Sequence, residues 1–196
     1  MIKIIAIDFG GVYFTWSDKK AVKDLCKITG ADSKSVRSSM HKHIKKLHVL
    51  AITEKQYWHR FCKDIGKNIN HRLLQKTIES QCKPIYPVIR FVEQLRKNYK
   101  IALVSNFTPL LDDYDKKYHF YKNFDYLLSS HMVRLRKPHA PIFKLLIKRT
   151  KAKPEEIIFI DDLQRNINGA KKVGIKTILF KNLKQLKKEL KKHRIK

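Results

Sequence analysis

Carboxylate and hydroxyl side chains stand at the ends of short apolar runs in this sequence. Asp8, Ser105 and the pair Asp161–Asp162 each close such a run. Carboxylates that meet at one site repel one another unless a cation lies between them, and Mg²⁺ in proteins binds carboxylates, backbone carbonyls, water and substrate phosphate. If the fold brings these residues together, their types predict a magnesium site.

Two glycines and a lysine add to this chemistry. Gly10 and Gly11 follow Asp8 almost directly and let the backbone bend tightly, which exposes its carbonyl and amide groups to an ion and to an anionic substrate. Lys137, immediately before Pro138, supplies a fixed positive charge.

The elements that must position these residues are strands and helices in alternation. From residue 85 onward, helical patterns separate apolar runs of strand length, which is typical of a parallel sheet. In open parallel sheets the ligand site lies beyond the carboxyl ends of the strands, where Asp8, Ser105 and Asp161–Asp162 stand. The predicted strands are Ile2–Ile7, Ile101–Ser105, Tyr126–Ser129, Ile157–Ile160 and Thr177–Phe180.

A helical segment follows the first strand and interrupts this alternation. It extends to Lys83–Pro87, where two prolines are expected to interrupt helical structure. About four helices are predicted, with starts at Ser17, Ser33 and Asn70 and a capping box at Thr53–Gln56. No convincing strand occurs here, so the segment is predicted to be an insertion into the α/β core.

Length and composition limit the class of protein. The 196 residues, 43% of them apolar, suffice for one core domain, which argues against intrinsic disorder. The apolar runs fall far short of the roughly 20 residues of a membrane span, and Asp8 interrupts any leader-like segment. Three cysteines without a C-x-x-C pair argue against a disulfide framework or a zinc site. We expect a cytoplasmic protein without membrane contact, as a monomer or a homodimer.

Four segments resemble the ordered motifs of the haloacid dehalogenase superfamily, whose members are mostly phosphatases: IIAIDFGGVYF, LVSNF, RLRKPHAPIFKLL and IIFIDDLQRNINGAKKVGIKTILF. The resemblance covers nearly the whole chain. It is greatest to the subgroup that includes sugar-phosphate phosphatases and the phosphatase domain of soluble epoxide hydrolases. It implies an α/β fold with a Rossmann-like three-layer core, formed by residues 1–14 and 85–196, and an inserted helical cap formed by residues 15–84.

The resemblance also implies roles for individual residues. Asp8 would be the nucleophile that forms an aspartyl-phosphate from a phosphate monoester, which water then hydrolyses. Ser105 and the neighbouring Asn106 amide would hold a phosphoryl oxygen, and Lys137 would neutralise charge on the nucleophile and on the transferring group.

The implied cofactor is Mg²⁺, bound by Asp8, the backbone carbonyl of Gly10 and Asp162, with Asp161 close by. Asn166 would orient an acidic ligand or a metal-bound water. The expected substrate is a small phosphorylated metabolite, either a sugar phosphate or a nucleotide.

Two positions depart from the family's pattern. Gly10 stands where most of its phosphatases carry a second Asp as general acid and base, help that is worth about 10²–10⁴-fold. Arg134 replaces a small residue expected before Lys137, and it would narrow the site or contact an anion. Trp16 is expected to line the cleft between cap and core, whereas helix packing is the expected role of Trp58 and Phe61.

The charge leaves a different function open. With 44 Lys and Arg against 17 Asp and Glu, the net charge is +27, but the excess is spread along the chain. The basic tail 181–196 has Leu183, Leu186 and Leu190 at helical spacing and is predicted to be an amphipathic helix docked on the core. A catalytically weak module that binds nucleic acid through this charge is one alternative.

A dehalogenase of 2-haloacids is the other alternative. A departing halide needs no proton, so the missing acid at Gly10 would be harmless. Asp161–Asp162 argues against this chemistry, which needs no magnesium.

Overall fold

Five parallel strands form the sheet at the centre of the fold. The computed structural model describes residues 1–195. The strand order is β3-β2-β1-β4-β5, and every neighbouring pair is parallel. Because β1 is central, its carboxyl end lies between those of β2 and β4. The strands are β1 (Ile4–Ile7), β2 (Lys100–Ser105), β3 (Tyr126–Ser129), β4 (Ile157–Asp161) and β5 (Lys176–Leu179).

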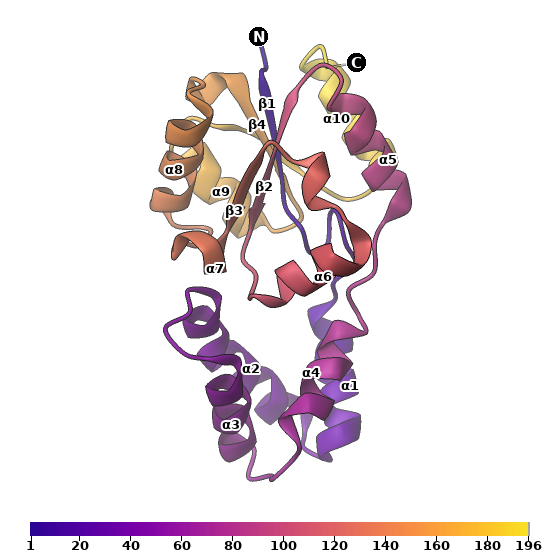
Figure 1. Cartoon of the computed structure of the whole chain (residues 1–196), viewed down its shortest axis with the longest axis vertical. Helices are drawn as coiled ribbons and strands as arrows, with labels where there is room; N and C mark the ends of the chain where they lie inside the picture. The colour runs from indigo at the N-terminus through magenta and orange to yellow at the C-terminus, as the bar shows by residue number, and fades with distance from the viewer. Residues whose placement is uncertain (196) are drawn as a thin grey trace.

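Helices cover both faces of this sheet, which gives the predicted three-layer α/β arrangement (Figure 1). On one face lie α5 (Tyr86–Leu95), α6 (Leu110–Tyr118) and α10 (Leu183–Lys192). On the other lie α8 (Ala140–Thr150) and α9 (Gln164–Lys171). Alternate side chains of β1 point to opposite faces, so Ile5 and Ile7 join the first core and Ile4 and Ala6 the second. Short turns complete the core: η1 (Tyr121–Asn123), α7 (Ser130–Val133) and η2 (Pro154–Glu156).

A four-helix insertion follows β1 and lies beyond the end of the sheet (Figure 1). It consists of α1 (Asp18–Thr29), α2 (Ser33–His48), α3 (Glu54–Asp64) and α4 (His71–Glu79). These helices bury a separate hydrophobic core that includes Leu25, Phe61 and Leu74, each fully buried. Trp58 and Phe61 belong to this core, as predicted.

Local sequence explains where these helices begin and end. The side chains of Ser17 and Asn70 accept backbone N–H groups of the first turns of α1 and α4. Thr53 and Gln56 form the predicted capping box of α3. Gly30 ends α1 in the left-handed conformation, which a residue without a Cβ adopts at no steric cost.

The two chain segments that join the insertion to the core lie side by side. The Thr15 hydroxyl donates to the carbonyl of Gln81, and the backbone N–H of Thr15 donates to the carbonyl of Lys83. Phe14 and Pro84 form an antiparallel bridge. The insertion therefore leaves and re-enters the core at one place.

One boundary prediction was confirmed and another was wrong. α2 begins at Ser33, as predicted, and the preceding Asp32 caps it, because the Asp32 carboxylate reaches the N–H groups of both Lys34 and Ser35. Pro87 does not interrupt helical structure but lies in the first turn of α5. Backbone N–H groups of a first turn have no partner within the helix, so proline is tolerated there. Within residues 1–195, no helix has the length and apolarity to cross a membrane.

Candidate functional site

The carboxyl ends of β1 and β4 bring three carboxylates together. Asp8 directly follows β1, Asp161 is the last residue of the neighbouring β4, and Asp162 directly follows it. One carboxylate oxygen of each lies within 4.8 Å of the others. Parallel pairing of the two strands produces this cluster, as the sequence predicts.

Asp8 is almost fully buried, and its two oxygens differ. Its Oδ1 accepts the N–H of Phe9 at 2.6 Å and contacts the Lys137 ammonium at 2.7 Å. Within residues 1–195, Oδ2 receives no hydrogen bond. Burial, and then the charge of Asp161, raises the pKa of Asp8 well above its ordinary value.

Lys137 is the cation that holds this cluster together. Its side chain is 1% exposed, and its Nζ lies 2.7 Å from both Asp8 Oδ1 and Asp161 Oδ2. Burial opposes the charge of Lys137, but the two carboxylates raise its pKa above the ordinary value. The ammonium is therefore retained at neutral pH and is shared between the two acids.

Asp161 and Asp162 have different surroundings although they are adjacent. Asp161 is satisfied by the protein: it contacts Lys137, accepts the N–H of Leu163, and receives Asn166 Nδ2 at 3.0 Å on each oxygen. Asn166 thus holds the Asp161 carboxylate in place. By contrast, Asp162 Oδ1 is buried without a hydrogen-bond partner, and burial followed by the charge of Asp161 raises the pKa of this carboxyl. An orphaned carboxylate oxygen beside two other carboxylates fits a divalent cation.

The turn after Asp8 needs glycine at Gly11. This residue has φ +86°, and a Cβ on it would collide with the Asp162 carboxylate. Gly10 lies against Trp16, whose Cβ would be 3.3 Å from a Cβ at this position. Trp16 is 36% exposed and therefore stands at the rim of the site, between the turn and the insertion.

Ser105 and Asn106 come from the end of β2, next to β1. Ser105 is buried, and its hydroxyl makes no hydrogen bond within the described residues. The Asn106 side chain donates to the Lys137 carbonyl at 2.9 Å and accepts the Lys137 N–H at 2.8 Å. Asn106 therefore fixes the backbone that presents Lys137, a role of its side chain that the sequence did not reveal.

Within residues 1–195, Arg134 forms no ion pair with the three carboxylates. It is exposed, has φ +57° and donates to the carbonyl of Val49 at the end of α2, at 2.9 Å. The left-handed conformation explains why a small residue was expected here. In this structure Arg134 bridges the core and the insertion.

Two further residues beside the site were not singled out from the sequence. His48 ends α2, and its Nδ1 is buried without a partner. Arg136 precedes Lys137, and its Nε is likewise buried and unpartnered. The position of Arg136 next to Lys137 was a signal available in the sequence, whereas nothing local marks His48.

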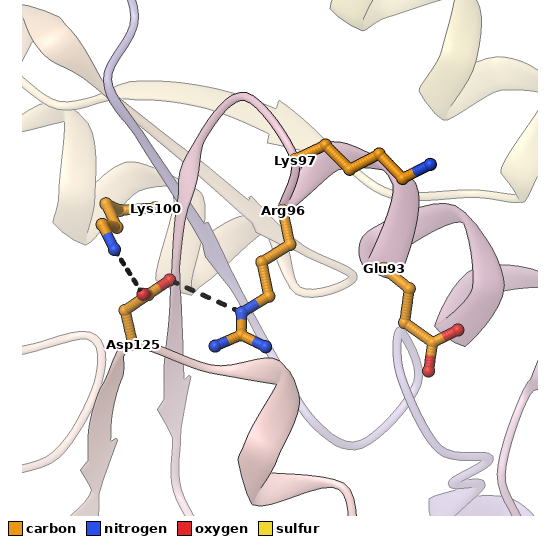
Figure 2. A pocket seen from close by; sticks show the side chains of 5 residues that line it. All are labelled: Glu93, Arg96, Lys97, Lys100 and Asp125. Carbon is orange, nitrogen blue, oxygen red and sulfur yellow. Dashed lines mark hydrogen bonds and ion pairs between the residues drawn. The ribbon is translucent and has the colours of Figure 1, made fainter.

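A surface hollow elsewhere on the core is a weaker candidate for the functional site. Figure 2 shows Glu93, Arg96, Lys97, Lys100 and Asp125 around it. Asp125 pairs with Lys100 at 2.9 Å and with Arg96 at 4.0 Å. Lys100 begins β2, so this hollow lies at the opposite end of the strands, and its acid is already paired.

Comparison with known proteins supports a hydrolase. The haloacid dehalogenase-like hydrolase family profile matches residues 20–180. D-ribitol-5-phosphate phosphatase of Bacteroides thetaiotaomicron is 26% identical over 207 residues, covering 97% of this chain and 97% of that protein. Bifunctional epoxide hydrolase 2 of Rattus norvegicus is 33% identical over 104 residues, or 50% of this chain. The matched region spans only 18% of the epoxide hydrolase.

A solved structure shares the fold. A family enzyme of Bacteroides thetaiotaomicron, in complex with magnesium and inorganic phosphate, superposes with a TM-score of 0.78 at 20% identity. The match covers 95% of this chain and 99% of that one.

Proposed function

Because the chain belongs to the haloacid dehalogenase-like hydrolase family, we propose that it is a Mg²⁺-dependent phosphatase of small phosphate monoesters that uses Asp8 as nucleophile. The observation that carries the proposal is the cluster of Asp8, Asp161 and Asp162 around the buried Lys137. Phosphatase relatives and the orphaned oxygen of Asp162 support it.

In the proposed reaction, an oxygen of Asp8 attacks phosphorus in line with the leaving alcohol, and an aspartyl-phosphate forms as the ester bond breaks. Water then hydrolyses this intermediate and releases phosphate. Lys137 offsets negative charge on Asp8 and on the transferring group, and the Ser105 hydroxyl donates to a phosphoryl oxygen. Asp161 and Asn106 keep Lys137 in place.

The cation would be held by Asp8, the backbone carbonyl of Gly10 and Asp162. Asp161 is satisfied by Lys137, Leu163 and Asn166, so we assign it to positioning rather than to metal binding. When bound, Mg²⁺ supplies positive charge that lowers the repulsion between carboxylate and phosphate.

Gly10 carries no acid, so the leaving oxygen takes its proton from water or from a group of the insertion. Such a site is best suited to esters whose alcohols leave easily. We propose that the four-helix insertion is a cap, formed by residues 15–84, that determines substrate specificity. Trp16 would lie at the rim of the cleft between this cap and the core. By analogy with the ribitol-phosphate phosphatase, the proposed substrates are small phosphorylated metabolites such as sugar phosphates or nucleotides.

All three cysteines, Cys26, Cys62 and Cys82, are free thiols. A reducing compartment keeps thiols in this state, which supports the cytoplasmic location that we propose.

The test is hydrolysis of p-nitrophenyl phosphate by the purified protein, with Mg²⁺ and with EDTA. We expect activity with Mg²⁺ only, loss of it in Asp8→Asn, and a higher Mg²⁺ requirement in Asp162→Asn. Glu155→Gln is the matched control, because Glu155 is an exposed acid at the opposite end of β4. Unchanged activity in Asp8→Asn would refute the proposed nucleophile.

The alternative functions predict other outcomes. Chloride release from a 2-chloroacid that EDTA does not affect would favour the dehalogenase. Inactivity in every condition, combined with sequence-specific nucleic-acid binding, would favour the binding module.

A further inference from the structure

Two arginines beside the site have no acidic partner. Arg136 is half-buried, with a buried and unpartnered Nε, and Arg165 is exposed in the first turn of α9. Neither forms an ion pair or a side-chain hydrogen bond within residues 1–195. Burial, and then the charge of Arg165, lowers the pKa of Arg136, so the two guanidinium groups repel each other.

His48 approaches the same place from the insertion. Burial, followed by the charges of Arg136 and Lys137, lowers its pKa to about 3. The ring is therefore neutral at physiological pH, and its buried Nδ1 has no partner. Arg134 holds the carbonyl of Val49, so the end of α2 is fixed against the core near α7 (Figure 1).

The neighbouring buried cation differs from this cluster. The Nζ of Lys137 lies 2.7 Å from a carboxylate oxygen of Asp8 and from one of Asp161, whereas Arg136 contacts no acid within the described residues. Unpartnered buried donors cost free energy, and so do like charges in proximity. An anion bound among Arg136, Arg165 and His48 would remove both costs.

The cluster is distinct from the place proposed for the transferring phosphoryl group, yet it is adjacent to it. Arg136 is covalently next to Lys137, and Arg165 lies close enough to Asp162 for its charge to lower the pKa of that carboxyl. One small molecule can therefore reach both places.

We propose that Arg136, Arg165 and His48 form a second anion subsite, and that the preferred substrate carries a carboxylate or a second phosphate besides the phosphate that is cleaved. The assignment rests on the proposed phosphatase function and narrows its substrate class. The neutral His48 ring contributes a hydrogen bond from the insertion, and the arginines contribute charge from the core.

A matched pair of substrates tests the subsite by turnover. 3-Phosphoglycerate and glycerol 3-phosphate differ only in a carboxylate that replaces a hydroxymethyl group. We expect kcat/KM to be about 10- to 100-fold higher for 3-phosphoglycerate, the range for hydrogen bonds to charged groups. This ratio should fall toward 1 in Arg136→Gln and in Arg165→Gln. Because Arg165 is exposed, its variant tests the subsite even if Arg136→Gln folds poorly.

Lys188→Gln is the control for net charge. It removes one positive charge from the exposed face of α10, far from the insertion (Figure 1), and should keep the wild-type ratio. Equal loss of preference in Lys188→Gln and Arg165→Gln would assign the effect to overall charge and overturn the subsite.

Binding separates this inference from the proposed reaction. Titration calorimetry of the Asp8→Asn variant with 3-phosphoglycerate and with glycerol 3-phosphate compares the two binding affinities without turnover. Fructose 1,6-bisphosphate against fructose 6-phosphate distinguishes a phosphate-selective from a carboxylate-selective subsite. A preference for the second anion in either pair supports the subsite even if no ester is hydrolysed, and equal affinities in both pairs would overturn it.

Discussion

Ionisation of Asp8 costs stability. This residue is buried beside Asp161 and Asp162, and Lys137 compensates for only part of their negative charge. The uncompensated negative charge lowers the stability of the free protein, and a bound cation would compensate for it.

We therefore expect Asp8→Asn to be more stable than the wild type in EDTA. The pKa of Asp8 is raised in the folded state, so ionisation of this group destabilises the fold once the pH exceeds the unfolded value. The gain from Asp8→Asn should be small at pH 4, should grow as the pH rises from the unfolded toward the folded pKa, and should level off above the folded pKa. Calorimetry at pH 4 and pH 8 measures it, and a gain of about 1 kcal/mol would raise Tm by roughly 2–4 °C. A lower Tm of the variant at pH 8 would contradict this expectation.

The sequence revealed the residues of the site that follow strands, but not those that depend on tertiary packing. Asp8, Ser105 and Asp162 could be predicted because parallel strands bring their carboxyl ends to one edge. His48 and Arg165 stand on helices with no distinguishing pattern, and only the packing of the insertion against the core brings His48 near Lys137.

At the scale of elements, strands were easier to predict than their exact ends. The buried strands consist almost entirely of apolar residues, and this signal does not depend on context. The start of α2 at Ser33 was predicted correctly, but its cap was not identified, because Asp32 and Ser33 are both good caps and the geometry of the turn chooses between them. The four-residue helix α7 is too short for its periodicity to be recognised.

Arg134 links two elements at some conformational cost. A non-glycine residue in the left-handed region costs roughly 1–2 kcal/mol, while the hydrogen bond to Val49 returns about 1 kcal/mol. We expect Arg134→Ala to lower the free energy of unfolding. We expect Arg134→Gly, which also loses the bond but relieves the strain, to remain close to the wild type.

Urea unfolding of both variants measures this difference. The comparison is internally controlled, because both variants lack the same guanidinium group. Equal destabilisation by Ala and Gly would show that backbone strain at this position is negligible.

For the whole molecule, the charge of +27 is the dominant property. Lysines cover the exposed faces of many helices, including α10, whose apolar residues Leu186 and Leu190 are buried against the core as predicted. Such a field attracts any polyanion and concentrates phosphorylated substrates near the surface.

We accordingly expect weak binding to duplex DNA at low salt, with the same affinity for unrelated sequences. Because this binding depends on counterion release, it should be lost between about 50 mM and about 200 mM salt. Fluorescence anisotropy with two unrelated duplexes tests both statements. Binding that persists at about 200 mM salt and prefers one duplex would instead indicate a specific nucleic-acid partner.

The central position of β1 has a consequence for the order in which the chain folds during synthesis. β1 is made before its two neighbours, β2 and β4, which begin only at Lys100 and Ile157. The four-helix insertion, which has its own core, is complete before either neighbour has been made. The nascent chain therefore carries the whole insertion and an unpaired apolar strand until β2 has been made, and we expect this strand to be a chaperone-binding site during that interval.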